Sequence, residues 1–220
     1  MNTLRNTKRS ARAIGAAVAV ASLLGLGVHS TPAGASGMSF GAKLDHFSDP
    51  SNAEGGISCD QNHGIPKHSN CTWVSVQAYH NGGHEQAPAT GTIKHVRLVS
   101  CVAGSFVLQF AKASPSARTA QVLRNGPTIH YKADPRQVDN NPDTFCGGDD
   151  GDDFIIQSFA VNVHVNKGEY VAINAAKGGM FYCSGGSGLL LFAPPLSPGG
   201  ATQHAKATAS CNLMVQLSYT

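Results

Sequence analysis

The sequence carries little charge and few aromatic residues. Charged residues make up 13% of its 220 residues and aromatic residues 7%, with a single tryptophan. Four of its 16 Lys and Arg residues fall within the first 35 residues, which hold no acid, so the remainder has 12 bases against 13 acids. This near-neutral balance argues against binding to nucleic acid or an anionic membrane through net charge. A hydrophobic content of 41% argues against intrinsic disorder.

Long hydrophobic runs are absent after the first 35 residues. These residues comprise a basic segment (1–12), an apolar stretch (13–28) and the small-residue end Ala33-Gly34-Ala35, a pattern typical of a secretory signal peptide. The apolar stretch is short for a membrane anchor. We therefore expect 1–35 to be a signal peptide and 36–220 to be a single secreted domain, extracellular or associated with the cell envelope, with no membrane span and no nucleic-acid partner.

Six cysteines follow the predicted signal peptide, and an even number in an exported chain predicts three disulfides. Cys59 and Cys71 bracket a segment rich in Gly, Pro, Asn and His, so we expect them to pair. Cys146 with Cys183, and Cys101 with Cys211, are the remaining expected pairs. The alternative for the first pair is a zinc site with His63 and His68, but an oxidising compartment favours the disulfide.

Alternation of apolar and polar residues is the main structural signal in the predicted domain. Val161, Val163 and Val165 alternate with Asn162, His164 and Asn166, as expected for a half-buried strand. Turn sequences such as Asn125-Gly126-Pro127 and Asn166-Lys167-Gly168 separate the runs, and 114–124 fits either a short helix or a strand. The pattern predicts an all-β, antiparallel, two-sheet sandwich, jelly-roll-like in its order. Strands are expected at 38–44, 72–79, 91–102, 105–111, 128–132, 154–165, 170–175 and 212–219.

Three of these segments carry a family resemblance. Gly91-Thr92-Ile93-Lys94-His95-Val96-Arg97-Leu98, Gly104-Ser105-Phe106-Val107-Leu108 and the run from Phe159 to Ile173 with its Lys167-Gly168-Glu169 turn resemble the layout of uncharacterised secreted β-sandwich proteins of actinobacteria. The resemblance implies a jelly-roll-like fold and a secreted habitat. It implies no catalytic residues.

An acidic stretch from 134 to 153 holds seven of the 13 acids. Calcium binds six to eight oxygens from carboxylates and carbonyls, and the interspersed glycines suit such a loop. The sequence therefore predicts a possible structural Ca²⁺ site, the alternative being a solvated acidic loop. The candidate ligands are Asp139, Asn141, Asp143, Asp149, Asp150 and Asp152.

Aromatic side chains are candidate platforms for sugar rings. Trp73 shares one face of its predicted strand with Tyr79, and that face is either core or binding surface. The candidate ligand-binding residues are Trp73, Tyr79, Tyr131 and Tyr182.

Two further patterns bear on chemistry. His80, His84 and Glu85 surround a predicted tight turn that either binds a transition metal or is an ordinary polar tip. Ser187 lies in a glycine-rich run, yet it lacks the sequence context of a serine nucleophile. We therefore expect a non-catalytic binding or cell-envelope module whose ligand is a polysaccharide or another envelope component. The alternatives are a structural or protein-interaction domain and, third, a secreted hydrolase.

Overall fold

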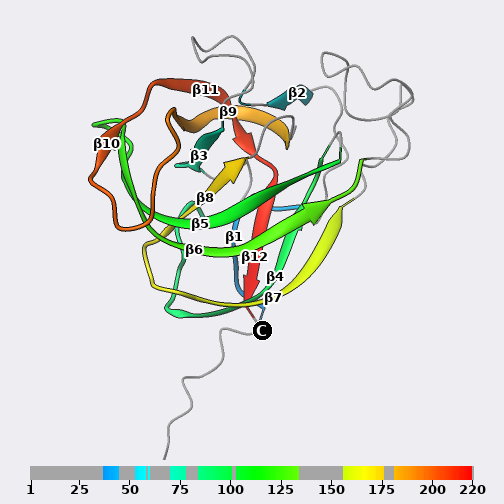
Figure 1. The fold of residues 1–220 in the computed structure, drawn as a ribbon. Helices are drawn as coiled ribbons and strands as arrows, with labels where there is room; N and C mark the ends of the chain where they lie inside the picture. Colours follow the sequence, from blue (N-terminus) through cyan, green and yellow to red (C-terminus); the bar gives the residue numbers. More distant parts are fainter. Residues whose placement is uncertain are drawn as a thin grey trace, which may run out of the picture. The chain divides into compact units, whose positions relative to one another are not determined.

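The described part of the chain consists of β-strands and their connections (Figure 1). The computed structural model describes residues 37–44, 53–57, 59, 70–77, 84–100, 103–133, 156–175 and 181–219. The strands are β1 (Ser39–Gly41), β2 (Ala53–Ile57), β3 (Cys71–Ser75), β4 (Gly91–Leu98), β5 (Gly104–Ser114), β6 (Thr119–Tyr131), β7 (Gln157–Val165), β8 (Tyr170–Ala175), β9 (Phe181–Phe192), β10 (Gln203–His204), β11 (Ala207–Leu213) and β12 (Val215–Tyr219).

The strands form two antiparallel sheets, which confirms the predicted all-β, two-sheet class. The small sheet has the order β1-β12-β4-β7. The large sheet has the order β10-β6-β5-β8-β3-β9-β11, with β2 also paired to β9. Neighbouring strands in space are mostly distant in sequence, so the pairing is dominated by long-range contacts. No helix in the described residues is long and apolar enough to cross a membrane.

The main hydrophobic core lies where the inward faces of the two sheets meet. The small sheet contributes residues such as Phe40, Ile93 and Leu217, and the large sheet contributes Trp73 and Phe106, all 1% exposed or less. These positions alternate along each strand with residues of the opposite face, as strand geometry requires. Burial of these aromatic and aliphatic side chains supplies the main driving force for folding.

A second core covers the opposite face of the large sheet. Val74, Ala172, Leu190 and Phe192 point to this face and pack with Leu196, which lies in the connection 193–202 between β9 and β10. We call this connection the strap.

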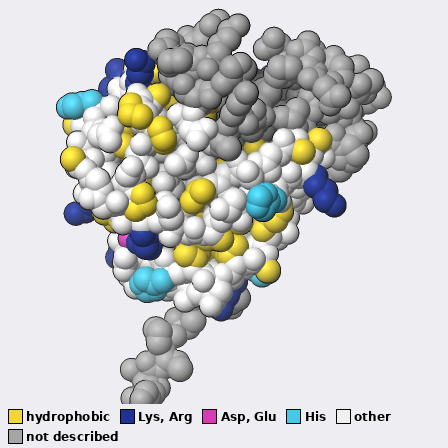
Figure 2. Space-filling model, viewed as in Figure 1, with side chains coloured by type: hydrophobic (Ala, Val, Ile, Leu, Met, Phe, Trp, Pro, Cys, Tyr) yellow, Lys and Arg dark blue, Asp and Glu magenta, His cyan; other side chains and the backbone are white. Residues whose placement is uncertain are grey.

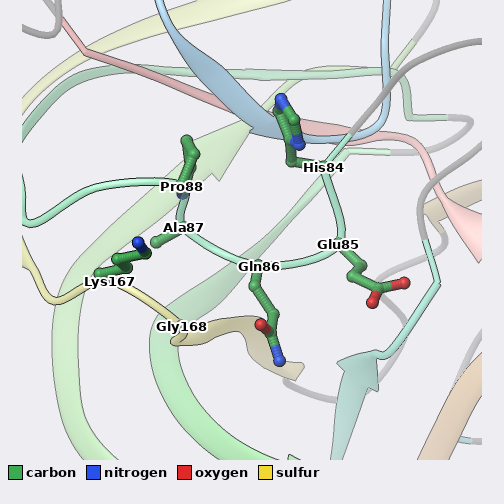
Figure 3. A pocket seen from close by; sticks show the side chains of 7 residues that line it. All are labelled: His84, Glu85, Gln86, Ala87, Pro88, Lys167 and Gly168. Carbon is green, nitrogen blue, oxygen red and sulfur yellow. The ribbon is translucent and has the colours of Figure 1, made fainter.

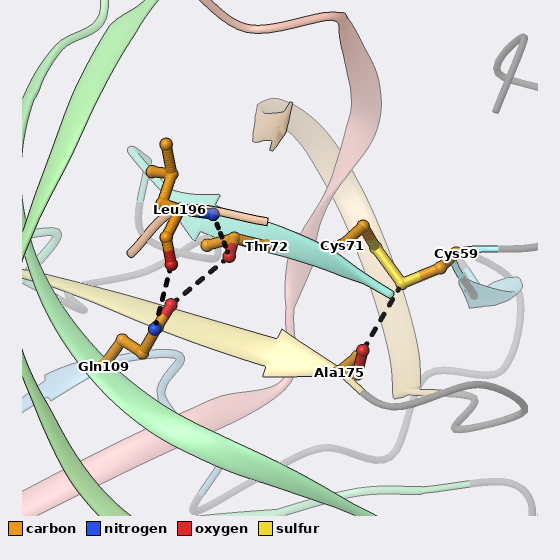
Figure 4. Close-up of a disulfide and its surroundings, with 6 residues drawn as sticks. All are labelled: Cys59, Cys71, Thr72, Gln109, Ala175 and Leu196. Atoms are coloured by element: carbon orange, nitrogen blue, oxygen red, sulfur yellow. Dashed lines mark hydrogen bonds between the residues drawn. A yellow bond between two sulfur atoms is a disulfide. The ribbon is translucent and has the colours of Figure 1, made fainter. Parts of the chain in front are cut away.

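Two buried polar side chains of the large sheet hold the strap in place (Figure 4). The Leu196 N–H donates to the Thr72 hydroxyl at 3.0 Å, and that hydroxyl donates to Gln109 Oε1 at 3.3 Å. Gln109 Nε2 donates to the Leu196 carbonyl at 3.4 Å and to Asn125 Oδ1 at 2.9 Å. Both faces of the central strands are therefore covered.

The structure differs from the sequence prediction at one turn, and it decides the conformation of the segment 114–124. The turn expected at 125–127 is wrong, because β6 continues through it. The register between β5 and β6 shifts between Val107 and Gln109, so that β6 has one extra residue there. Gly126-Pro127 therefore forms a β-bulge. Proline is tolerated in a bulge because it has no N–H to donate to the neighbouring strand. Of the segment 114–124, residues 115–118 form a turn and the rest is strand, so the helix alternative is excluded.

The predicted disulfide between Cys59 and Cys71 is confirmed, with their Cα atoms 5.6 Å apart. The zinc alternative is wrong, because a disulfide leaves no thiolate to bind the metal. Cys211 is also disulfide-bonded. Cys101, Cys146 and the side chain of Cys183 lie outside the described part, so the other two pairings stay predictions.

Candidate functional site

A pocket of about 330 Å³ opens where the segment before β4 lies beside the turn between β7 and β8 (Figure 3). Its walls combine acidic, basic, amide and small apolar side chains. The lining residues are His84, Glu85, Gln86, Ala87, Pro88, Lys167 and Gly168.

Backbone hydrogen bonds fix the two walls to each other. The Ala87 N–H donates to the Glu169 carbonyl at 2.9 Å, and the Gly168 N–H donates to the Ala87 carbonyl at 2.8 Å. The Lys167 N–H donates to Thr90 Oγ1 at 3.0 Å. Gly168 has a φ of +85°, a conformation that glycine adopts without steric cost. The pocket is thus built on a rigid frame.

A third segment anchors the outer end of the pocket. The Gly41 N–H donates to the His84 carbonyl at 2.7 Å. Gly41 has a φ of +87°, and a Cβ at this position would collide with the Val215 carbonyl oxygen. Only glycine therefore allows β1 to bind both β12 and the pocket segment.

Glu169 is the buried charged residue behind the pocket, and it is 4% exposed. Both of its carboxylate oxygens accept hydrogen bonds from Arg124 at 2.5 Å. The backbone N–H and side-chain amide of Asn166 donate to the same carboxylate at 2.9 and 2.8 Å. Burial acts to raise the pKa of Glu169, but these hydrogen bonds and the Arg124 charge outweigh it and hold the pKa below its ordinary value. The carboxylate therefore remains ionised.

Arg124 links the pocket frame to the large sheet. Its guanidinium carbon lies 4.5 Å from the centroid of the Phe110 ring, a cation–π contact. One guanidinium nitrogen also donates to the His164 carbonyl at 2.7 Å. Since Arg124 lies on β6 of the large sheet and His164 on β7 of the small sheet, this side chain joins the two sheets beside the turn that carries Lys167.

The pocket presents both hydrogen-bond donors and hydrogen-bond acceptors to solvent. His84, Glu85 and Lys167 are exposed and Gln86 is half-buried. Figure 3 shows residues 84–88 along one wall, with Lys167 and Gly168 beside Ala87. Carboxylate, amide and ammonium groups around small apolar surfaces suit a polar molecule with several hydroxyl groups.

The predicted aromatic platform is wrong for two of its residues. Trp73 is 0% exposed and Tyr131 is 3% exposed, and both belong to the core between the sheets. Trp73 has no exposed face because β3 is central in the large sheet, with the small sheet over one face and the strap over the other. Burial also raises the pKa of Tyr131.

Most other predicted site residues lie outside the described part of the chain. These include Tyr79, His80 and the calcium candidates Asp139, Asn141, Asp143, Asp149, Asp150 and Asp152; the side chains of Tyr182 and Ser187, on β9, are also not described. Within the described ranges no group of three or more His, Cys, Asp or Glu side chains is placed to hold a metal ion. The calcium site stays a prediction.

The pocket could not be predicted from the sequence. Asn166-Lys167-Gly168 is a predicted turn, and His84 and Glu85 are polar residues near another predicted turn, but no pattern indicates that these turns meet. The two walls are about eighty positions apart in sequence, and their pairing is set by long-range strand order.

No protein-family model, curated protein or solved structure matches the chain.

Proposed function

We propose that this chain is a secreted, non-catalytic module that binds carbohydrate or another component of the cell envelope, with the pocket as its binding site. The proposal includes a jelly-roll-like strand order, as the resemblance to secreted actinobacterial β-sandwich proteins implies. The Cys59–Cys71 disulfide supports export, since such bonds persist mainly in oxidising compartments.

The observation that carries the proposal is a pocket with a hydrogen-bonded backbone frame and polar side chains along its walls. Its volume of about 330 Å³ lies at the small end of ligand pockets, the size class for a small polar group such as one sugar residue. Glu85 and Gln86 supply acceptors, and Gln86 and Lys167 supply donors. Because the walls are cross-linked by backbone hydrogen bonds, the backbone that carries these groups is ordered before a ligand arrives, which reduces part of the entropic cost of binding.

The state of the carboxylates supports binding over glycoside hydrolysis. Most glycosidases need two carboxyl groups, one of which donates a proton. Glu169 is ionised and both of its oxygens are engaged by Arg124, so it is unsuited to proton donation. Among the described residues that line the pocket, Glu85 is the one carboxylate.

The test is binding of the oxidised protein to a panel of neutral polysaccharides and their fragments by calorimetry. Glu85→Ala and Lys167→Ala each remove a polar group from the pocket wall and are expected to weaken binding by about tenfold, the equivalent of one or two lost hydrogen bonds. Lys112→Ala is the matched control, because Lys112 is exposed on β5 of the large sheet and lies outside the pocket lining.

Two outcomes would contradict the proposal. Binding that is unchanged in both pocket variants would place the site elsewhere. Turnover of a glycoside, ester or peptide that is lost with Glu85→Ala would show that the pocket is catalytic.

A further inference from the structure

The pocket brings charged side chains of opposite sign into one cavity. Two acidic residues have described side chains, and both lie at the pocket, Glu85 in its lining and Glu169 behind it. Lys167 lines the pocket from the turn between β7 and β8. On the face of the molecule seen in Figure 2, the described surface carries scattered basic side chains and hardly any acidic ones. An acid and a base that line one cavity are therefore a local feature of this site.

The two carboxylates differ in what compensates their charge. Glu169 is paired with Arg124 through both of its oxygens, so the pair adds no net charge to the pocket. The Glu85 carboxylate makes no hydrogen bond or ion pair with any residue of the described ranges, and the same holds for the Lys167 ammonium. The pocket therefore offers one anionic and one cationic group that are available to a ligand.

Glu85 and Lys167 do not neutralise each other. Figure 3 shows the Glu85 carboxylate and the Lys167 ammonium on opposite sides of Gln86 and Ala87. The segments that carry them are joined by the backbone, since the Gly168 N–H donates to the Ala87 carbonyl at 2.8 Å. The frame thus places the two opposite charges apart, at the two ends of the lining.

The lining between the two charges is uncharged. Gln86 is half-buried, and its amide is both a donor and an acceptor of hydrogen bonds. Ala87 is buried and Pro88 is half-buried, so they add a small apolar surface. An amide beside apolar carbon atoms suits a sugar ring, which has hydroxyl groups at its edge and C–H groups on its faces.

The two charges decide which sugar fits the pocket best. A ligand that fills the pocket removes water from Glu85 and Lys167, and a charged group that loses water without gaining a partner is costly. A neutral sugar compensates neither charge fully, and a sugar with one charge compensates one of them. A sugar with both an ammonium group and a carboxylate compensates both, through hydrogen bonds that are stronger than those between neutral groups.

We propose that the ligand of the pocket is a zwitterionic sugar, with Glu85 binding its ammonium group, Lys167 binding its carboxylate and Gln86 binding the hydroxyls between them. This inference rests on the proposed function, because it assigns the ligand class of the same pocket. It also assigns specificity to two residues, Glu85 for the positive end of the ligand and Lys167 for the negative end.

The test is calorimetric titration with muramic acid, a sugar with an amino group and a carboxylate-bearing ether on neighbouring ring carbons. At about pH 7 its amino group is largely protonated and its carboxylate is ionised. Glucosamine carries the ammonium group alone, N-acetylmuramic acid carries the carboxylate alone, and glucose carries neither. Muramic acid is expected to bind about tenfold more tightly than glucosamine or N-acetylmuramic acid, because it makes one more charge-assisted hydrogen bond than either.

Two variants test which residue binds which charge. Glu85→Gln keeps the size of the side chain and should weaken binding of muramic acid and glucosamine by about tenfold while leaving N-acetylmuramic acid nearly unchanged. Lys167→Gln should weaken muramic acid and N-acetylmuramic acid and leave glucosamine nearly unchanged. A general disturbance of the pocket would weaken all of these ligands alike. Lys112→Gln, at an exposed position of β5 outside the lining, is the control and should change none of them.

The outcomes separate this inference from the proposed function. If glucose bound as tightly as muramic acid and Glu85→Ala weakened both, the pocket would bind sugar but the zwitterion inference would be overturned. If alanine, a zwitterion without sugar hydroxyls, bound as tightly as muramic acid, the site would recognise an amino acid and the sugar assignment would be overturned. If no sugar bound, or if binding were unchanged in both pocket variants, the proposed function of the pocket would fail as well.

Discussion

Glu169 shows how a single buried charge fixes the candidate site. A carboxylate that is 4% exposed is costly unless its lone pairs are satisfied. Arg124 and Asn166 satisfy both oxygens of Glu169, and the same contacts hold the turn that carries Lys167. Removal of one partner from such a pair costs more than the pair itself contributes, because the other charge is left without compensation.

Glu169→Gln is therefore expected to lower the free energy of unfolding at neutral pH by about 1–3 kcal/mol, the cost of losing hydrogen bonds to a charged group. The folded pKa of Glu169 lies below its ordinary value of 4.5, so its stabilisation is present above that value and is lost as pH falls through the folded pKa. The glutamine variant should lack this part of the acid destabilisation. Urea unfolding from neutral pH down to about pH 3 measures both effects.

Glu85→Gln is the control for this prediction, because Glu85 is exposed. It should change stability by no more than about 0.5 kcal/mol. If the stability of Glu169→Gln fell with pH in parallel with that of the unaltered protein, the predicted contribution of the ionised Glu169 to stability would be contradicted.

Sequence alternation could not decide the role of Trp73. A period of two separates the residues of a strand into two faces, but it does not say whether one face or both are covered. In β3 both are, since Trp73 packs between the sheets and Val74 packs beneath the strap. The strap lies more than a hundred positions after β3 in the chain, so no local sequence pattern around Trp73 indicates that the strap covers this face.

At the scale of elements, alternation located the regular strands well. The strand predicted at 170–175 matches β8, and β4 and β7 begin or end at predicted limits. The long strand β9 was missed because Gly185-Gly186-Ser187-Gly188 has the composition of a loop. Its register against β11 shifts across these residues, and a Cβ on Gly188 would collide with the Asn212 side chain. Glycine there serves close packing within a strand rather than a turn.

The strap is predicted to depend on the Thr72 hydroxyl. Thr72→Val keeps the side-chain shape but leaves the Leu196 N–H without its acceptor in a buried site. We expect a loss of about 1–3 kcal/mol in the free energy of unfolding, the cost of an unsatisfied buried donor, together with faster proteolysis within 193–202. Thr208→Val on β11 is the control, because Thr208 is exposed. Equal stability of the two variants would show that the strap is held by Leu196 packing alone.

At the scale of the whole molecule, the large sheet is the shared wall of two cores. Its one face packs against the small sheet and its other face packs against the strap. Central strands are consequently buried on both faces, which explains the continuous burial of Leu189, Leu190, Leu191 and Phe192 in β9.

The Cys59–Cys71 disulfide joins the segment before β3 to the large sheet. The Cys59 sulfur lies 3.9 Å from the Ala175 carbonyl oxygen on β8, and both cysteines are buried. Twelve positions separate the two cysteines, and closure of a loop of about this length restricts the unfolded chain by about 3 kcal/mol. Cys59→Ala/Cys71→Ala should lower the free energy of unfolding by that order, as measured in urea without reductant.

Unfolding in the presence of a reductant distinguishes the contribution of the Cys59–Cys71 bond to stability from that of the disulfide at Cys211. Cys211 is disulfide-bonded as well, so dithiothreitol should destabilise the Cys59→Ala/Cys71→Ala variant further, by opening a bond that the variant retains. If reductant left that variant unchanged, the Cys211 bond would contribute nothing to stability. If the variant were as stable as the unaltered protein, packing alone would hold the segment before β3.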